Sequence, residues 1–466
     1  MSFSADVNGS ATDMQNRTDL TEGPIFSKLI KLSLPIIGTS FIQMAYNLTD
    51  VIWLGRAGSA TVTAVTTAGF FMWLLLSIFY CTKSGTETLV AQSVGKKDDS
   101  MARLVAENAV TCSIYGSIVM NLLILVFSAD LLQFFKLEPD VMAEAVSYLR
   151  IVSFGMCFAI INLVLSAIYI GFGNSKTPFI VNSLGLVINI ILDPILIFGF
   201  LFIPQLGAEG AAIATVISNT LVFSVFVFKL NSSGSVLPDF RLFSRVTKPV
   251  LAKIFKVGLP VSIQQVTFCL FSMYIGRIVS AYGTIPLGVQ NVGANIEALS
   301  WSTALGFSTA LTAFTGQNFG AAEYDRIRKG YFFILLLSLS LGLVATVGFV
   351  FFGEEIFSLF SKDQEMVAVG VLYLKILAIS QIFMCIEITS AGGFYGLGKT
   401  KPPSITSVLF TGLRVPAAIF VVNFTPYGYA GVWWCISISS VLKGIIVASL
   451  YFLTLRKLTL YRPVAS

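Results

Sequence analysis

Residues 148–173 read YLRIVSFGMCFAIINLVLSAIYIGFG, and residues 373–398 read YLKILAISQIFMCIEITSAGGFYGLG. Both stretches open with Tyr-Leu, a basic residue and Ile, continue with a long and mostly apolar run, and close with Gly-x-Gly. A helix rises about 1.5 Å per residue, so roughly 20 apolar residues cross a hydrocarbon core of about 30 Å. Each stretch therefore predicts a membrane-spanning helix, and the pair indicates an internal repeat.

Similar apolar runs recur along almost the whole chain. Of its 466 residues, 55% are hydrophobic and 12% are charged, and the mean hydropathy is +0.83. This composition excludes a soluble domain. A transmembrane β-barrel would show short segments of alternating polarity, whereas these runs are continuous in Leu, Ile, Val, Phe, Ala and Gly. The sequence predicts an all-α membrane protein with twelve transmembrane helices.

The residue inventory argues against a metal or cofactor. Histidine is absent, and the six cysteines lie inside apolar runs without Cys-x-x-Cys spacing, where thiols pack as small hydrophobes. Residues 393–400 fit the phosphate-loop pattern GxxxxGK[ST], but they end a membrane span and run into Pro402 and Pro403. We expect a tight turn there, and no cofactor, metal or nucleic-acid partner.

The distribution of basic residues predicts the topology. The first 24 residues are polar and lack the pattern of a cleaved signal peptide. Lysines and arginines, which give the net charge of +6, cluster in alternate connections, including residues 96–103, 241–248 and 326–329. By the positive-inside rule these connections face the cytoplasm. We expect a multi-pass protein of the inner (cytoplasmic) membrane with both termini in the cytoplasm.

The two halves repeat at a constant offset of 225 residues. Pro35 corresponds to Pro260, Gln92 to Gln317 and Tyr148 to Tyr373. Six spans per repeat give both halves the same orientation, so we expect two six-helix bundles related by a pseudo-twofold axis along the membrane normal. The predicted segments are a polar tail (1–24), an amino-terminal lobe (25–230), a cytoplasmic linker (231–250), a carboxy-terminal lobe (251–455) and a tail (456–466).

The repeated Pro, Gln and Tyr residues are accompanied by two further motifs, GQNFGA at 316–321 and GAEGAAIAT at 207–215. In these features the chain resembles the multidrug and toxic compound extrusion (MATE) transporters over nearly all of residues 25–455. The resemblance implies two lobes in a V-shaped arrangement that alternate access. It also implies drug efflux driven by protons or sodium. The chain is also similar to the DinF-type branch of this family, which has an Asp on its first span and Asn-x-x-x-Asp on its fifth.

Five residues form a predicted cation-coupling site in the amino-terminal lobe. Asp50 and Asp193 are carboxylates within spans, and each has a polar residue one turn earlier, Tyr46 and Asn189; Thr215 lies at a similar depth on span six. Two acids in one pocket can share a proton, which favours H⁺ as the coupling ion. Sodium bound by Asp50, Asn189, Asp193 and Thr215 is the alternative. A purely structural interpretation is that Asp50 caps a span and Asp193 bonds to a kink at Pro194.

The carboxy-terminal lobe has its own intramembrane charges. Glu387 and Arg414 are expected to pair with each other, and a structural role is as consistent with the sequence as a transport role. For Glu297 and Arg277 the sequence likewise allows either a structural role or a transport role. On the second span, Lys83 and Glu87 are four residues apart and predict a local ion pair.

The substrate pathway is expected to use aromatic, Met and amide side chains together with the charges of the second lobe. The candidates are Gln43, Met44, Tyr148, Gln264, Gln265, Phe268, Glu297, Glu387 and Arg414. The predicted function is export of organic, cationic or amphipathic compounds by a monomer that is in contact only with membrane lipids and small molecules. A flippase for lipid-linked oligosaccharide or peptidoglycan precursors is the alternative, although it should carry more cationic residues around its cavity. No motif in the sequence supports a channel or an enzyme.

Overall fold

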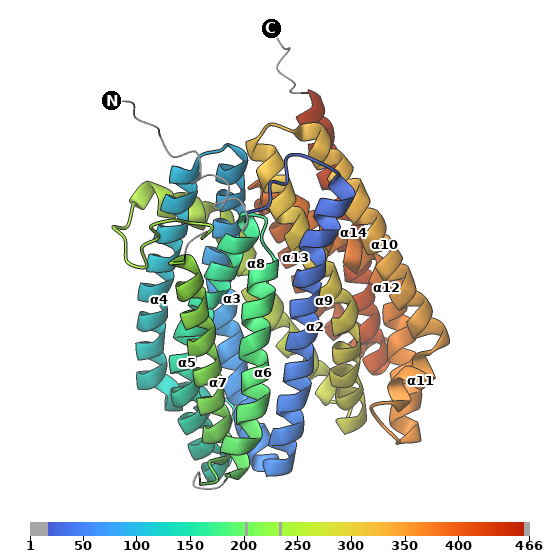
Figure 1. Cartoon of the computed structure of the whole chain (residues 1–466). Coiled ribbons are helices and arrows are strands. Elements are labelled where there is room, and N and C mark those ends of the chain that lie inside the picture. Colours follow the sequence, from blue (N-terminus) through green and yellow to red (C-terminus); the bar gives the residue numbers. More distant parts are fainter. Residues whose placement is uncertain (1–16, 201–203, 233–234, 461–466) are drawn as a thin grey trace, which may run out of the picture. The chain divides into compact units, whose positions relative to one another are not determined.

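The computed structural model describes residues 17–200, 204–232 and 235–460, and within helices the side chains of residues 47, 48, 50–52, 59, 459 and 460 also lie outside the description. Every long element in this part of the chain is a helix (Figure 1). The helices are α2 (Ile25–Ala57), α3 (Ser59–Gly95), α4 (Asp99–Gln133), α5 (Pro139–Gly171), α6 (Lys176–Phe198), α7 (Gly207–Leu230), α8 (Lys248–Ser280), α9 (Thr284–Gly320), α10 (Tyr324–Phe351), α11 (Gly353–Ser358), α12 (Gln364–Gly396), α13 (Lys401–Phe424) and α14 (Gly428–Leu460).

Eleven of the described helices are long and apolar enough to cross a membrane. The remaining long helix, α9, has Gln290, Asn291, Asn295 and Glu297 in its first half. Counting α9, the long helices match the twelve spans predicted from the sequence. The predicted fold class, an all-helical protein of many spans, is confirmed.

The internal repeat appears in the bounds of the helices. α3 and α9 begin and end 225 residues apart, and so do α5 and α12. Residues with positive φ recur at the same offset, as at Gly58 and Gly283, and at Lys97 and Ala322. One difference is that α4 is continuous, whereas its counterpart is divided at Phe352 into α10 and α11. The repeat therefore extends to the turns that end the helices.

The chain divides into two compact units. Unit 1 holds the described residues up to Asp19 together with Gly38–Gly258, and unit 2 holds Leu20–Ile37 together with the chain from Leu259 onward. The chain passes between the units three times: once before α2, between Asp19 and Leu20, and twice inside a helix, in α2 close to Pro35 and in α8 close to Pro260. The lobe boundaries expected from sequence, which keep all of α2 in the first lobe and begin the second lobe at residue 251, remain a prediction.

Helix α5 is central to unit 1, where it packs against α3, α4 and α7. One buried hydrophobic cluster of unit 1 is mostly aliphatic and includes the ring contact between Tyr169 and Phe226. Unit 1 also includes the first turns of α8. A Cβ on Gly258 would lie only 1.8 Å from the carbonyl oxygen of Cys81 on α3, so glycine permits the two backbones to touch.

Helix α12 has the same role in unit 2, where it packs against α9, α10 and α14. Its glycines allow close approach: a Cβ on Gly392 would meet the backbone of Ser308 on α9 at 2.4 Å. Tyr373 packs edge to face against Trp433 of α14. This packing brings polar side chains of α9, α12, α13 and α14 into the interior of the unit.

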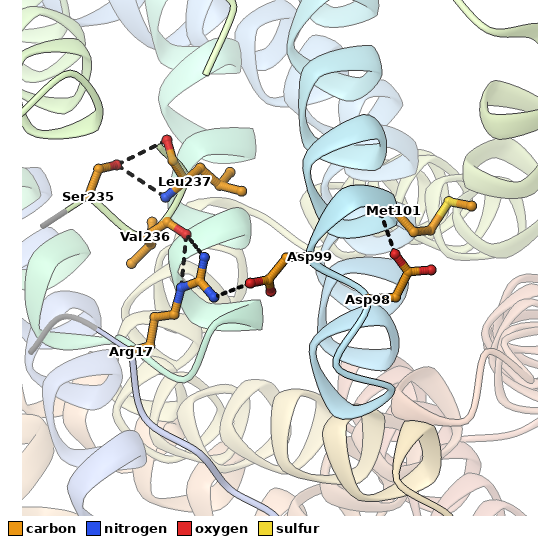
Figure 2. Close-up of polar contacts among 7 residues, drawn as sticks. All are labelled: Arg17, Asp98, Asp99, Met101, Ser235, Val236 and Leu237. Atoms are coloured by element: carbon orange, nitrogen blue, oxygen red, sulfur yellow. Dashed lines mark hydrogen bonds and ion pairs between the residues drawn. The ribbon is translucent and has the colours of Figure 1, made fainter. Parts of the chain in front are cut away.

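The connection between α7 and α8, predicted as a linker, lies against α4. The backbone amides of Arg241 and Thr247 donate to the Glu107 carboxylate and the Asn108 side chain. Arg17 adds a further restraint within the predicted amino-terminal tail: its guanidinium donates to the Val236 carbonyl at 2.7 and 3.1 Å and to the Asp99 carboxylate at 2.8 Å (Figure 2). Residues 1–16 and 461–466 of the two predicted tails lie outside the described residues.

Candidate functional site: buried polar residues in the two units

Helix α6 carries a deeply buried carboxylate in unit 1. Asp193 and Asn189 are 1% and 2% exposed, and their i, i+4 spacing places them on one face of the helix. The Asn189 side-chain amide donates to Asp193 Oδ1 at 3.2 Å. Pro194 follows directly inside the helix. Because an amide does not neutralise a carboxylate, the charge at Asp193 must be balanced by another group, a cation or a proton.

The other predicted members of this site are placed only in part. The side chain of Asp50 lies outside the described residues, and Tyr46 is half-buried on α2. Thr215 is half-buried on α7 and donates to the carbonyl of Ala211 in its own helix. Helices α6 and α7 pack together. The structure thus joins Asn189 to Asp193 and puts Thr215 on the neighbouring helix, while the five-residue pocket as a whole stays a prediction.

Two buried polar residues of unit 1 were not singled out from the sequence. Asn162 on α5 donates to the carbonyl of Asn219, and Ser218 lies on α7. Asn162 Oδ1, Asn189 Oδ1 and Ser218 Oγ are buried without a hydrogen-bond partner among the described residues. The repeat could have identified both residues, since 225 positions later the chain has Glu387 and Lys443.

In unit 2, Glu297 belongs to a hydrogen-bonded cluster. The Tyr373 hydroxyl donates to Glu297 Oε1 at 2.7 Å, and the Gln381 amide donates to Oε2 at 3.4 Å. Ser300 in turn donates to Gln381 Oε1 at 2.7 Å. These neutral donors fix the carboxylate of α9 against α12.

A buried ion pair joins α12 and α14. The Lys443 ammonium lies 3.0 Å from Glu387 Oε2, with the side chains 7% and 9% exposed. Arg414 of α13 donates instead to the hydroxyls of Ser439 and Ser440 at 2.5 and 2.8 Å. The expectation that Glu387 and Arg414 form the ion pair is therefore wrong. Lys443 takes the position of partner because α14 packs directly against α12, whereas α12 makes little contact with α13.

The remaining candidates occupy varied environments. Gln43 and Phe268 are exposed, and Met44 and Gln265 are half-buried. Gln264 accepts a hydrogen bond from the Tyr395 hydroxyl at 3.3 Å. Tyr148 is buried among aliphatic side chains of α3 and α5, and Arg277 is exposed. Their assignment to a substrate pathway remains a prediction.

The ion pair predicted on α3 is present in the structure. Lys83 Nζ lies 2.7 Å from Glu87 Oε2, and Glu87 is almost fully buried. Its second oxygen, Oε1, is buried without a hydrogen-bond partner in the described part of the chain.

Comparison with known proteins decides the family. The MatE profile matches residues 35–195 and 260–420, one match in each half and with the same offset of 225. The chain belongs to the MatE family. These are transporters and not enzymes. The first match includes Asn189 and Asp193 of α6, and the second includes Glu387 of α12 and Arg414 of α13.

This MatE protein is similar to several curated relatives. It is 27% identical over 420 residues to the probable multidrug resistance protein NorM of Thermotoga maritima, covering 88% of each chain. It is also 27% identical over 405 residues to the probable multidrug resistance protein YoeA of Bacillus subtilis, covering 86% of this chain and 87% of that protein. The multidrug export protein MepA of Staphylococcus aureus is 22% identical over 444 residues, 94% of this chain and 96% of MepA.

Solved structures share the fold. A multidrug resistance MATE family transporter in the outward-facing conformation superposes with a TM-score of 0.87 at 23% identity, over 94% of this chain and 98% of that one. A MATE structure in the straight conformation gives 0.87 at 24% identity, over 95% and 98%. The MATE fold therefore describes nearly the whole chain.

Proposed function

We propose that this chain is a secondary active antiporter of the cytoplasmic membrane that exports organic, cationic or amphipathic compounds in exchange for protons. The observation that carries the proposal is the buried Asn189 and Asp193 pair on α6. An ionisable residue buried in a membrane helix bundle is costly to keep, and it commonly serves an ion pathway. Membership of a family whose curated relatives include multidrug resistance and export proteins supports organic compounds as the cargo.

The proposed coupling site comprises Tyr46, Asp50, Asn189, Asp193 and Thr215. The Asn-x-x-x-Asp spacing on α6 supports the DinF-type branch of the family. Protons are favoured over sodium because two neighbouring acids raise the proton affinity of one of them, whereas a sodium site gains little from a second full charge. On this proposal, loading a proton removes a buried negative charge and lets α2 and α6 bend at Pro35 and Pro194.

The proposed topology has both termini in the cytoplasm. The basic connections at 96–103, 241–248 and 326–329 support it. Gln43, Met44, Tyr148, Gln264, Gln265 and Phe268, with Glu297, Glu387 and Arg414, remain the proposed substrate-pathway residues.

Transport in proteoliposomes tests the proposal. Purified protein is reconstituted, and efflux of a cationic dye is followed under an imposed proton gradient, under an imposed sodium gradient and with neither. Acceleration by the proton gradient alone is expected. Acceleration of efflux by the sodium gradient alone would show that the coupling ion is sodium and not the proton. Scrambling of a fluorescent pyrophosphate-linked lipid without dye transport would favour the flippase alternative.

A further inference from the structure

The two units place different groups at equivalent positions of the repeat. In unit 1, α5, α6 and α7 each carry a buried neutral polar residue: Asn162, Asn189 and Ser218. In unit 2 the residues 225 positions later are Glu387, Arg414 and Lys443, on α12, α13 and α14. Conversely, the acid Asp193 of unit 1 corresponds to Ala418, which is fully buried. At the three positions 162, 189 and 218 unit 1 thus has neutral polar groups, whereas at the corresponding positions unit 2 has a carboxylate and two cations attached to the chain.

The ion pair in unit 2 shows what these cations do. Lys443 reaches Glu387 from the next packed helix at 3.0 Å, and both side chains are less than a tenth exposed. A carboxylate buried this deeply requires a positive charge or a proton to offset the loss of hydration. Lys443 supplies that charge permanently.

The formal charges of Glu297, Glu387, Arg414 and Lys443 in unit 2 sum to zero. Glu297 and Glu387 bring two negative charges, and Arg414 and Lys443 bring two positive ones. Arg414 is held by the hydroxyls of Ser439 and Ser440, so its position does not depend on a mobile ion. Removing Lys443 alone would leave one uncompensated negative charge inside the unit.

We propose that the Lys443 ammonium is a built-in substitute for a transported cation: it fills the cation position at Glu387, so that unit 2 takes up no coupling ion there and cation exchange is confined to unit 1. The inference rests on the proposed function for its statement about unit 1. The claim about unit 2 concerns only Glu387 and Lys443. It follows that replacing Lys443 by Ser, the residue at the equivalent position of unit 1, creates a new cation site at Glu387.

The test measures cation-dependent stability, because a ligand that binds the native state raises its melting temperature. All variants carry Asp193→Asn, which removes one carboxylate of the proposed coupling site and with it the cation response expected from that site. The parent and the Lys443→Ser, Lys443→Arg and Lys443→Ser/Glu387→Gln variants are purified in detergent. Their melting temperatures are compared in sodium chloride and in choline chloride at equal ionic strength, and at neutral and acidic pH.

Lys443→Ser should gain a melting-temperature rise on the order of 3 °C or more in sodium or at acidic pH, relative to the same shift in the parent. Lys443→Arg retains the charge and should behave like the parent. The added Glu387→Gln change should abolish the new response. This readout remains usable if Lys443→Ser is less stable, since the cation should then restore part of the lost stability.

The proposal is overturned if Lys443→Ser responds to sodium and pH no more than the parent, or if its response persists without the Glu387 carboxylate. Failure of the proposed function would appear elsewhere, as dye efflux by Asp193→Asn at the wild-type rate in the otherwise unchanged protein. The two failures are therefore distinguishable.

Discussion

The Lys443 ammonium and Glu387 Oε2 lie 3.0 Å apart between α14 and α12, in the interior of unit 2. Breaking a buried ion pair by removing one partner leaves the other charge uncompensated and costs about 3–5 kcal/mol, whereas an apolar replacement of both partners is often neutral. We therefore expect loss of one partner of this pair to destabilise the protein more than loss of both.

Glu387→Leu alone should lower the melting temperature markedly, because Lys443 is left buried and charged. Glu387→Leu combined with Lys443→Met should recover most of the loss, because both charges are gone. Thermal unfolding of the purified variants in detergent measures both. A double variant no more stable than the single one would show that the pair acts through packing and not through charge.

Tyr373→Phe should weaken the link between α12 and α9. The hydroxyl donates to the Glu297 carboxylate at 2.7 Å, and a hydrogen bond to a charged group contributes about 1.5–3 kcal/mol. The ring packing on Trp433 stays intact, so only the hydrogen bond is removed. Tyr331→Phe, which loses a hydrogen bond to the neutral Ser390 hydroxyl, is the matched control and should cost less. Equal losses in melting temperature would argue against a charged Glu297.

Gly258→Ala should destabilise unit 1. The added methyl group would lie 1.8 Å from the carbonyl oxygen of Cys81, a distance that backbone atoms cannot relieve without separating α8 from α3. Gly276→Ala, further along the same helix, meets nothing nearer than the Gln290 side chain at 3.9 Å and should be tolerated. Monodisperse yield in size-exclusion chromatography and melting temperature compare the two. Equal behaviour would contradict the close helix contact.

The cap of α4 predicts a pH dependence. Asp98 precedes α4, and its carboxylate accepts a hydrogen bond from the Ser100 hydroxyl. It also accepts one from the Met101 amide (Figure 2). These bonds, that of Ser100 first, lower the pKa of Asp98 below its ordinary value. Because the folded pKa is lowered, the cap contributes stability above the ordinary pKa and loses it as pH falls through the lowered one.

Hydrogen exchange of the first turn of α4 should therefore quicken at acidic pH in the wild type, beyond the intrinsic change of exchange rate. Asp98→Asn retains a capping oxygen but has no carboxylate to titrate, so its protection should vary less over the same range. Identical pH profiles would exclude the Asp98 cap as the cause.

Much of the fold could be predicted from the sequence. A lipid bilayer requires long apolar helices, and the repeat shows which helix of one half corresponds to which helix of the other. The offset of 225 that links Tyr148 to Tyr373 also links the ends of α5 and α12. Pairing between helices was harder. Nothing in the sequence ranks Arg414 against Lys443 as partner of Glu387, because the choice depends on which helix packs against α12.

The candidate site shows the same limit. The spacing of Asn189 and Asp193 predicts their contact, since residues four apart on a helix are neighbours. Contacts across helices, such as that of Asn162 on α5 with Asn219 on α7, depend on packing and were not anticipated. The repeat does point to Asn162 and Ser218, because they occupy the positions that correspond to Glu387 and Lys443. Their interest becomes clear only once the ion pair between Glu387 and Lys443 is known.

The most direct test of the central claim is dye efflux by Asp193→Asn in proteoliposomes under an imposed proton gradient. The amide is close in shape and easier to bury than a carboxylate, so insertion and folding should be retained. Size-exclusion chromatography and melting temperature verify this. We predict that gradient-driven efflux falls to the level of protein-free liposomes, and that Asp50→Asn does the same. Efflux by both variants at the wild-type rate would contradict coupling at this site.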